Sequence, residues 1–258
     1  MHHFEGVASH GPGRMTDLST SPRISVVVPV RNETPNVLPL VEEIERACAP
    51  LAPFEVIYVD DGSTDDTGQQ VLNARTTRPW LRLVRHEASC GQSAAVRTGV
   101  LAARAPIVVT LDGDGQNDPA FIPQLVAALD NPAVALVAGQ RLGRKDGAYK
   151  KWQSRIANGV RGRILKDGTR DTGCGLKAFR RDVYLRLPYF DALHRFMPAL
   201  VKREGYSVAH VDVVDRPRHA GRSNYGMFDR LWVGILDLAG VWWLIRRRRR
   251  VPTAQEIV

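Results

Sequence analysis

VVTLDGDGQ, residues 108–116, is a hydrophobic run that ends in two carboxylates separated by one glycine. Because side chains alternate along a strand, Asp112 and Asp114 point the same way and converge at the carboxyl end of that strand. Two carboxylates held so close repel one another unless a cation lies between them. Oxygen ligands suit Mg²⁺ or Mn²⁺, ions that often bridge to phosphate oxygens. The alternative is a polar turn that follows a buried strand.

A second strand also ends in acidic residues. FEVIYV, residues 54–59, has the pattern of a buried strand and leads directly into Asp60 and Asp61. Ser63 or Thr64 is expected to cap the following helix, with two aspartates in its first turn. Ligands of open α/β sheets bind outside the carboxyl ends of the strands. Two strands that bring carboxylates to this edge therefore indicate a nucleotide site.

Strands and helices alternate along the chain from Ile24 onward. Strands are expected at residues 24–30, 55–59, 81–84, 107–111 and 134–137, and helices at 35–48, 65–74, 91–103 and 119–129. The less regular second half is expected to add helices at 150–165 and 193–204 and strands at 176–179 and 207–215. This alternation predicts an α/β fold, a single domain with a mostly parallel central sheet flanked by helices.

The composition divides the chain into four segments. Residues 1–22 are rich in His, Gly, Ser and Thr and lack an apolar run, which predicts a disordered tail. Residues 23–226 are the α/β domain, residues 227–250 a C-terminal amphipathic helix with an arginine cluster, and residues 251–258 a second tail. The three cysteines are far apart and lack metal-ligand spacing, which fits a reducing compartment.

Positive charge is concentrated in the second half. The formal net charge is +9, and Arg246 to Arg250 supply five consecutive positive charges near the C-terminus. Such a balance is typical of proteins that bind nucleic acid, anionic lipid or phosphorylated substrates. The paired carboxylates put negative charge in the expected binding cleft, which argues against a nucleic-acid ligand because its phosphates are also negative. The sequence contains no recognised nucleic-acid-binding motif.

Residues 228–245 are apolar but interrupted. On a helical wheel, polar and small residues fall on one side and most of the bulky apolar residues on the other. The first set is Asp229, Arg230, Gly234, Asp237 and Gly240, and the second is Trp232, Ile235, Leu238, Trp242, Trp243 and Ile245. The segment is slightly short for a membrane span and has a carboxylate in its middle. It predicts a helix in the interface of an anionic membrane, with a core helix and a solvated basic tail as the alternative.

With these motifs in order, the chain resembles glycosyltransferase family 2. DDGSTD at residues 60–65 is common to that family. Three further motifs resemble the branch that contains dolichol-phosphate mannosyltransferase and the bacterial polyprenyl-phosphate sugar transferases. They are DGDGQNDP at 112–119, DTGCG at 171–175 followed by Phe179-Arg180, and HAGRSNY at 219–225. The resemblance implies the GT-A fold, a Rossmann-like variant of the predicted domain.

The resemblance also implies roles on the donor side. Pro29 and Glu33 would lie beside the nucleotide, and Asp60 or Asp61 would contact its base or ribose. Asp112 would bridge from the metal toward the sugar nucleotide. The implied metal ligands are Asp112, Asp114 and Gln116, and the implied mobile loop over the diphosphate contains His219, Arg222 and Ser223.

On the acceptor side, the resemblance implies that Arg141 and Arg155 meet the phosphate of a lipid. Asp171 would orient an arginine or lie near the sugar, and a capped turn is its structural alternative. Two positions depart from the family: Arg31 replaces a usual aromatic residue, and Asn224 replaces a usual lysine. Base packing is therefore expected to differ, and Arg222 is expected to supply the missing charge.

The implied activity is metal-dependent, inverting transfer of a hexose from a nucleoside-diphosphate sugar, GDP-mannose or a UDP-sugar, to a polyprenyl phosphate. The protein would be cytoplasmic and peripheral on the inner face of the cytoplasmic membrane. One alternative is a family 2 enzyme for a soluble hydroxyl acceptor, with Asp171 as its base. A non-enzymatic basic membrane protein and a sugar nucleotidyltransferase are further alternatives. The oligomeric state stays open, with a homo-oligomer as one option.

Overall fold

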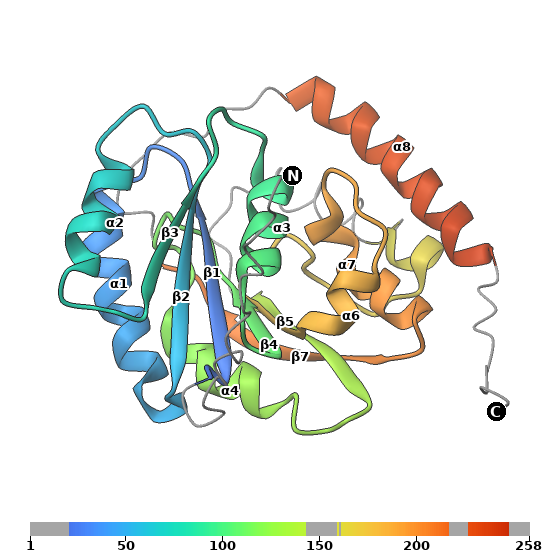
Figure 1. Cartoon of the computed structure of the whole chain (residues 1–258). Helices are drawn as coiled ribbons and strands as arrows, with labels where there is room; N and C mark the ends of the chain where they lie inside the picture. The colour runs from blue at the N-terminus through green and yellow to red at the C-terminus, as the bar shows by residue number, and fades with distance from the viewer. Residues whose placement is uncertain (1–20, 143–158, 160, 217–226, 248–258) are drawn as a thin grey trace, which may run out of the picture.

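The computed structural model describes residues 21–142, 159, 161–216 and 227–247. Within these residues, seven strands form one sheet in the order β3-β2-β1-β4-β6-β5-β7 (Figure 1). The strands are β1 (Ile24–Val30), β2 (Phe54–Asp60), β3 (Leu81–Arg85), β4 (Ile107–Thr110), β5 (Val134–Leu142), β6 (Lys177–Arg180) and β7 (Ser207–Val214). Strand β6 is antiparallel to both of its neighbours, and every other neighbouring pair is parallel. The predicted mostly parallel sheet is confirmed.

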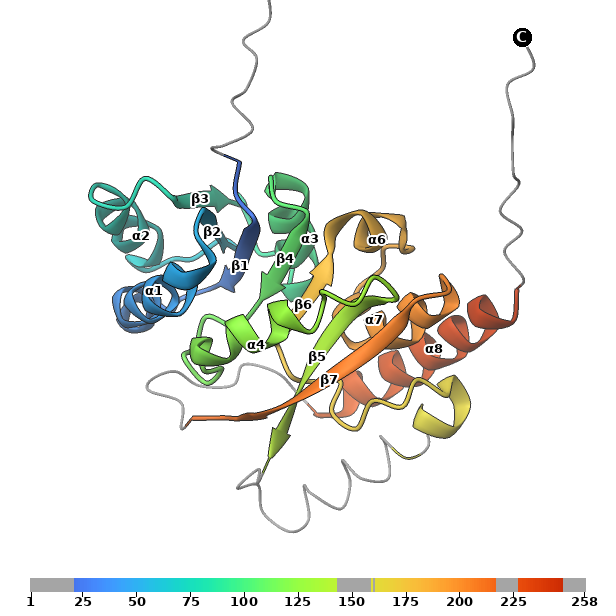
Figure 2. The ribbon, with the colours of Figure 1, turned by 90° about the horizontal axis from the view of Figure 1, so that it is seen from below.

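Helices cover both faces of this sheet, as Figure 2 shows from below. They are α1 (Thr34–Cys48), α2 (Thr67–Arg75), α3 (Gln92–Ala102), α4 (Ile122–Ala127), α6 (Arg181–Arg186), α7 (Leu193–Arg203) and α8 (Met227–Arg246), with 3₁₀ turns η2 (Ala49–Leu51) and η3 (Pro119–Phe121). Val26 and Val28 of β1 belong to the core shared with α1, α2 and α4, whereas Val27 belongs to the core shared with α3 and α7. Because both faces are buried, β1 is apolar throughout and does not alternate.

The start of α2 differs from the prediction that Ser63 or Thr64 caps it. The helix begins at Thr67, with Asp66 at the N-cap position. Asp65 accepts hydrogen bonds from the Thr67 hydroxyl at 2.6 Å and from the Thr34 hydroxyl at 2.7 Å. This carboxylate therefore joins the first turns of α1 and α2.

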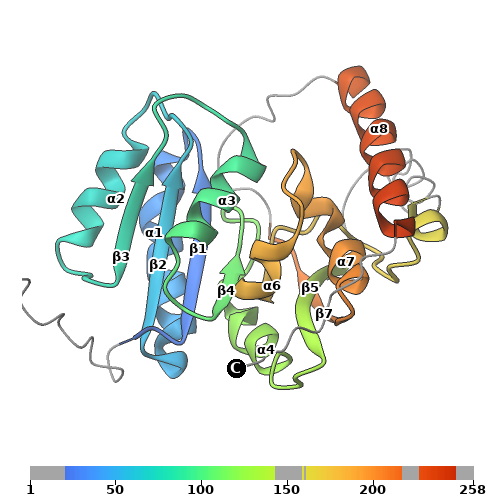
Figure 3. The ribbon, with the colours of Figure 1, turned by 45° about the vertical axis from the view of Figure 1, so that its right-hand side comes forward.

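Helix α8 lies against α7 at the outer side of the domain (Figures 1 and 3). Val241 is buried, and Leu238 packs partly buried against the same core. Trp242 and Trp243 are exposed. Asp237 is partly buried. Its pKa is raised mainly by this burial and to a smaller extent by the negative charge of Asp191. The helix is as expected, and the bulky apolar residues of the predicted face divide between the core and solvent, with Leu238 partly buried and Trp242 and Trp243 exposed.

Among the described helices, none is long and apolar enough to cross a membrane.

Candidate active site

The acidic turn at the end of β4 lies at the carboxyl edge of the sheet. Asn117, which is buried, accepts a hydrogen bond from the backbone N–H of Asp112 at 2.9 Å. Asp114 accepts one from the backbone N–H of Gln116 at 3.0 Å. Burial and the charge of Asp114 raise the pKa of Asp112 to about 6, against the opposing charges of Lys177 and Arg141. The structure thus brings Asp112 and Asp114 together as predicted, but in the turn after β4, which ends at Thr110, and not within the strand.

This turn fits a divalent cation. Two desolvated carboxylates that repel one another are stabilised by a hard positive charge, and carboxylate and amide oxygens are suitable ligands. Asp112, Asp114 and Gln116 all lie within this one turn of the chain. These three residues are the ones that the sequence predicts as ligands of Mg²⁺ or Mn²⁺. The prediction that they bind a metal stays a prediction.

Two other segments fix the carboxylate of Asp112. Gln92, the first residue of α3, donates a hydrogen bond from Nε2 to Oδ1 of Asp112 at 2.7 Å. A Cβ atom on Gly175 would overlap the carboxylate of Asp112. The Thr110 hydroxyl donates to the Gly175 carbonyl at 2.9 Å. Glycine at 175 therefore allows the 171–175 turn to approach the acidic turn closely.

Arg141, which lies in β5, is held by two carboxylates. Its Nε and Nη2 donate to the two oxygens of Asp171 at 2.6 and 2.9 Å, and its Nη1 donates to Asp215 at 3.3 Å. Although burial opposes it, the contact with Asp171 raises the pKa of Arg141. A bidentate pair fixes the plane of the guanidinium. Asp171 therefore orients an arginine, which is one of the roles expected for it.

Lys177 is a buried cation that the sequence analysis missed. It begins β6, pairs in register with Thr110 of β4, and is 2% exposed. Its Nζ donates to the backbone carbonyl oxygen of Cys174. The sequence feature that could have revealed it is a charged residue within the apolar run at 176–179, because strand formation alone does not require a lysine there.

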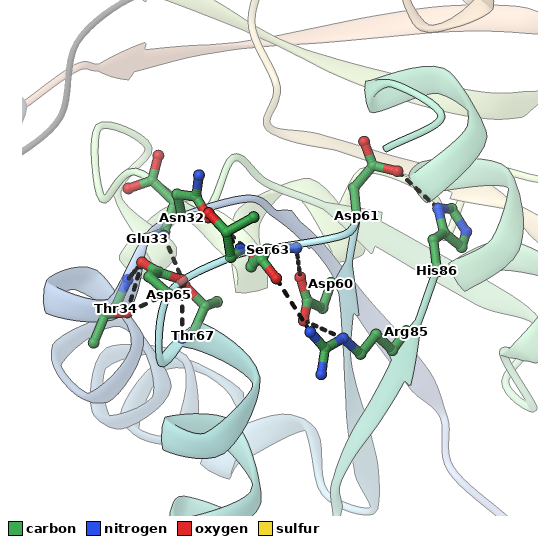
Figure 4. A network of polar contacts seen from close by, with 11 residues as sticks. Asn32, Glu33, Thr34, Asp60, Asp61, Ser63, Asp65, Thr67, Arg85 and His86 are labelled. Carbon is green, nitrogen blue, oxygen red and sulfur yellow. Dashed lines mark hydrogen bonds and ion pairs between the residues drawn. The ribbon is translucent and has the colours of Figure 1, made fainter. Parts of the chain in front are cut away.

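Asp60 and Asp61 point in different directions from the end of β2, as Figure 4 shows. Asp60 is fully buried, accepts a hydrogen bond from the backbone N–H of Ser63 at 2.8 Å, and lies 3.3 Å from Nε of Arg85. Asp61 faces the other way, toward His86. The two adjacent carboxylates therefore stabilise different loops, and the sequence prediction that either one contacts the nucleotide is not tested by these contacts.

The Asp61 carboxylate closes the loop that precedes α3. Its oxygens accept hydrogen bonds from His86 Nδ1, the Ser89 hydroxyl and the backbone N–H groups of Cys90 and Gly91 at 2.7–2.9 Å. Although burial opposes it, these hydrogen bonds hold the pKa of Asp61 below its usual range.

Asp61, His86 and Cys90 place ligand atoms within 4.8 Å of one another, an arrangement that suggests a metal site. Both imidazole nitrogens are already engaged, however, because His86 Nε2 lies 2.9 Å from the Thr98 hydroxyl. Hydrogen bonding fully accounts for this cluster.

The other sequence-predicted residues fall into two groups. Glu33 directly precedes α1, and its carboxylate accepts a hydrogen bond from Asn36 Nδ2 at 2.5 Å. The backbone N–H of Glu33 donates to the Thr67 hydroxyl at 2.8 Å. Pro29 of β1 lines a small pocket beside Asp112. Arg155, His219, Arg222 and Ser223 lie outside the described residues.

The comparisons define the protein class. The family model described as "Glycosyl transferase family 2" matches residues 25–187, and the chain belongs to this family. Dodecaprenyl-phosphate galacturonate synthase of Rhizobium johnstonii is 37% identical over 235 residues, which are 88% of this chain and 68% of that relative. Undecaprenyl-phosphate 4-deoxy-4-formamido-L-arabinose transferase of Edwardsiella ictaluri is 32% identical, over 83% of this chain and 66% of that relative. The chain thus spans about two thirds of these relatives, and the expected polyprenyl-phosphate branch is confirmed.

Solved structures share the fold. Glucosyl-3-phosphoglycerate synthase from Mycobacterium tuberculosis, in complex with Mn²⁺, UDP and phosphoglyceric acid, has a TM-score of 0.65 at 20% identity, covering 89% of this chain and 80% of its own. A mannosyltransferase from Pyrobaculum calidifontis, in complex with GDP-mannose and Mn²⁺, has a TM-score of 0.64 at 23% identity, covering 90% and 66%. The predicted GT-A fold is confirmed.

Proposed function

We propose that the protein transfers a sugar from a nucleoside-diphosphate sugar to a polyprenyl phosphate, with inversion at the anomeric carbon. The observation that supports this most directly is the meeting of an acidic turn with buried cations. Asp112 and Asp114 offer oxygen ligands, and the charges of buried Lys177 and partly buried Arg141 act on Asp112. The site therefore suits a metal-bound diphosphate next to a second anion. The two named relatives, which act on polyprenyl phosphates, support the same acceptor class.

The chemistry of the acceptor fits the residues present. A phosphate monoester is largely a dianion near pH 7, because its second pKa is about 6. It attacks without a general base, whereas a hydroxyl acceptor needs one. Asp171 was the candidate base for a soluble acceptor, but its bidentate pairing with Arg141 leaves it better suited to holding that arginine. A lipid phosphate is thus favoured over a hydroxyl.

The protein contributes position and charge. Mg²⁺ or Mn²⁺, held by Asp112, Asp114 and Gln116, would neutralise the charge that develops on the departing nucleoside diphosphate. Arg141, oriented by Asp171 and Asp215, would meet the acceptor phosphate together with Arg155, and His219, Arg222 and Ser223 would contact the diphosphate. Attack from the face opposite the diphosphate inverts the anomeric carbon.

An anionic membrane surface is the proposed location, at the cytoplasmic face where both substrates are accessible. Helix α8 supports this because its outer face is apolar and aromatic. Leu236 is 67% exposed and Trp243 is 53% exposed. The guanidinium of Arg246 lies 4.1 Å from the Trp242 ring centroid, at the end of the helix that leads into the arginine cluster. Exposed tryptophans followed by arginines suit the headgroup region of anionic lipid.

The transferase proposal is tested with purified protein, undecaprenyl phosphate and Mn²⁺. Radiolabelled UDP-glucose, UDP-galactose, UDP-galacturonate, UDP-glucuronate and GDP-mannose are supplied separately, and chloroform-soluble label is counted. We expect at least one donor to give a lipid-linked sugar of inverted anomeric configuration. Transfer to free sugars or peptides, with none to the lipid, would instead establish the soluble-acceptor alternative. Undiminished transfer in excess chelator would remove the metal from the mechanism.

The membrane proposal is tested by sedimentation with anionic vesicles. The double variant Leu236→Ser/Trp243→Ser is expected to lose vesicle binding while transfer to a detergent-solubilised lipid continues. Leu101→Ser is the matched control, because Leu101 is also an exposed apolar helix residue, at 55%, but lies on α3. Equal sedimentation of both variants and the unmodified protein would mean that α8 is not the contact.

A further inference from the structure

A small pocket opens beside Asp112, between the sheet and the two helices α3 and α7. Its polar lining comes from Gln92, Thr110, Asp112, Lys177 and His194. Pro29, Val96, Leu111, Gly175 and Met197 complete the wall. The pocket adjoins the carboxylate that the proposed function assigns to the sugar nucleotide, so a group carried by the donor sugar is the natural occupant. The inference below rests on that function.

Lys177 is the cation of this pocket. Its side chain is fully buried, and among the described residues no carboxylate forms an ion pair with it. Its recorded hydrogen bonds go to the backbone carbonyls of Cys174 and Thr172, the latter at 3.5 Å. An ammonium group has three N–H donors, so one donor remains for a ligand. A buried ammonium is costly unless it is paired with an anion.

The other lining groups offer no second positive charge. Gln92 and Thr110 are neutral, and His194 hydrogen-bonds to the Ser93 hydroxyl through Nδ1 at 2.8 Å. Burial, with the nearby charges of Lys177 and Arg195, lowers the pKa of His194 to about 3, so the imidazole is neutral. Asp112 is the carboxylate of the pocket lining, and a divalent cation held by Asp112 and Asp114 would compensate its charge. The charges of Asp112 and Asp171 also act on Lys177, but among the described residues neither carboxylate lies within ion-pair distance of its ammonium group.

We infer that Lys177 is a specificity residue that binds a carboxylate on the donor sugar, and that the donor is a nucleoside-diphosphate hexuronate. A carboxylate is flat and small, and it pairs with an ammonium through charge-assisted hydrogen bonds. A neutral hexose has a hydroxymethyl group at the same position and leaves the ammonium without a counter-charge. A site with a buried polar group discriminates strongly against a ligand that leaves that group unpaired.

The experiment compares sugar nucleotides that differ only at carbon 6. Binding of UDP-galacturonate and UDP-galactose, UDP-glucuronate and UDP-glucose, and GDP-mannuronate and GDP-mannose is measured by calorimetry with Mn²⁺ present. In at least one pair, the acid is expected to bind about tenfold to a hundredfold more tightly, the range of a charge-assisted hydrogen bond. Lys177→Met should abolish this preference, because it weakens binding of the acid by far more than binding of the neutral member, and Lys177→Arg should keep the preference.

Lys202→Met is the matched control, because it removes an exposed lysine of α7 away from the pocket, and its preference should equal that of the unmodified protein. Thermal unfolding verifies that each variant is folded. The inference is overturned if the unmodified protein binds no acid better than its neutral partner. It is also overturned if Lys177→Met weakens both members of a pair equally, since Lys177 then only offsets the acidic turn. Binding selectivity without any transfer to lipid phosphate would contradict the proposed function and leave the specificity of Lys177 standing.

Discussion

Replacing Asp61 with asparagine is expected to destabilise the loop before α3. The carboxylate is 5% exposed and accepts four hydrogen bonds, two on each oxygen. An amide offers one acceptor oxygen and one NH₂ group. If the NH₂ group of asparagine takes the position of Oδ1, it faces the backbone N–H of Cys90, so two donors meet. If it takes the position of Oδ2, it faces the backbone N–H of Gly91 in the same way. His86 and Ser89 can each reverse their hydrogen bond, but a backbone N–H cannot.

Asp61→Asn thus leaves one partly buried backbone N–H, of Cys90 or Gly91, without an acceptor and turns three charge-assisted hydrogen bonds into neutral ones. An unsatisfied donor costs about 1–3 kcal/mol when it is fully buried and less when water reaches it, and a charged hydrogen bond is roughly twice as strong as a neutral one. Partial relaxation of the loop reduces the sum, so the free energy of unfolding should fall by about 2–4 kcal/mol. The same loop leads to Gln92, whose hydrogen bond to Asp112 should weaken as well.

The loss should depend on pH in a defined direction. Hydrogen bonding holds the pKa of Asp61 below its usual range in the folded protein. Its contribution to stability is therefore complete above the unfolded pKa of about 3.9 and disappears as the pH falls through the lower, folded value. The difference between the unmodified protein and Asp61→Asn should stay constant from pH 5 to pH 8 and shrink below pH 4.

Urea denaturation followed by circular dichroism across this pH range measures both effects. Asp66→Asn is the control, because Asp66 is exposed in the same segment and its side chain makes no capping hydrogen bond. A surface change of this kind should stay within about 0.5 kcal/mol. Equal losses in the two variants, or a gap for Asp61→Asn that persists unchanged at pH 3, would refute the reasoning.

Three further outcomes test the site. Asp114→Asn should abolish Mn²⁺ binding and transfer without changing the melting temperature, and full activity at ordinary Mn²⁺ concentration would remove Asp114 from the metal site. Gly175→Ala should reduce kcat/KM at least about tenfold, because the new Cβ overlaps the carboxylate of Asp112; normal kinetics would show that the turn adjusts freely. Arg155→Lys should raise the KM for undecaprenyl phosphate about tenfold to a hundredfold in steady-state titrations, through loss of bidentate phosphate contacts. A raised donor KM with an unchanged lipid KM would reassign Arg155 to the nucleotide.

Local patterns were sufficient to predict the sheet and the acidic turn. The run at 108–111 and the pair Asp112 and Asp114 lie within nine residues of chain, so a local pattern locates them. Strand β4 ends at Thr110, however, so the two carboxylates meet in the turn after the strand and not through alternation within it. The alternation of strands and helices likewise predicted a mostly parallel sheet, because parallel strands need a crossover between them. A strand's direction relative to its neighbours is not local, however, and the antiparallel insertion of β6 between β4 and β5 was visible only in the structure.

What only the tertiary structure decided are contacts between distant segments. Asp61 closes a loop 25 to 30 residues away, and Arg141 meets Asp171 30 residues along the chain. A helical wheel does not include α7, so the sequence of α8 alone did not show which of its apolar residues pack against the core. Lys177 was missed because a lysine at the end of a short strand is usually solvated. Its burial beside Asp112 results from three strands and two helices packing around it, an arrangement that the sequence of β6 alone does not encode.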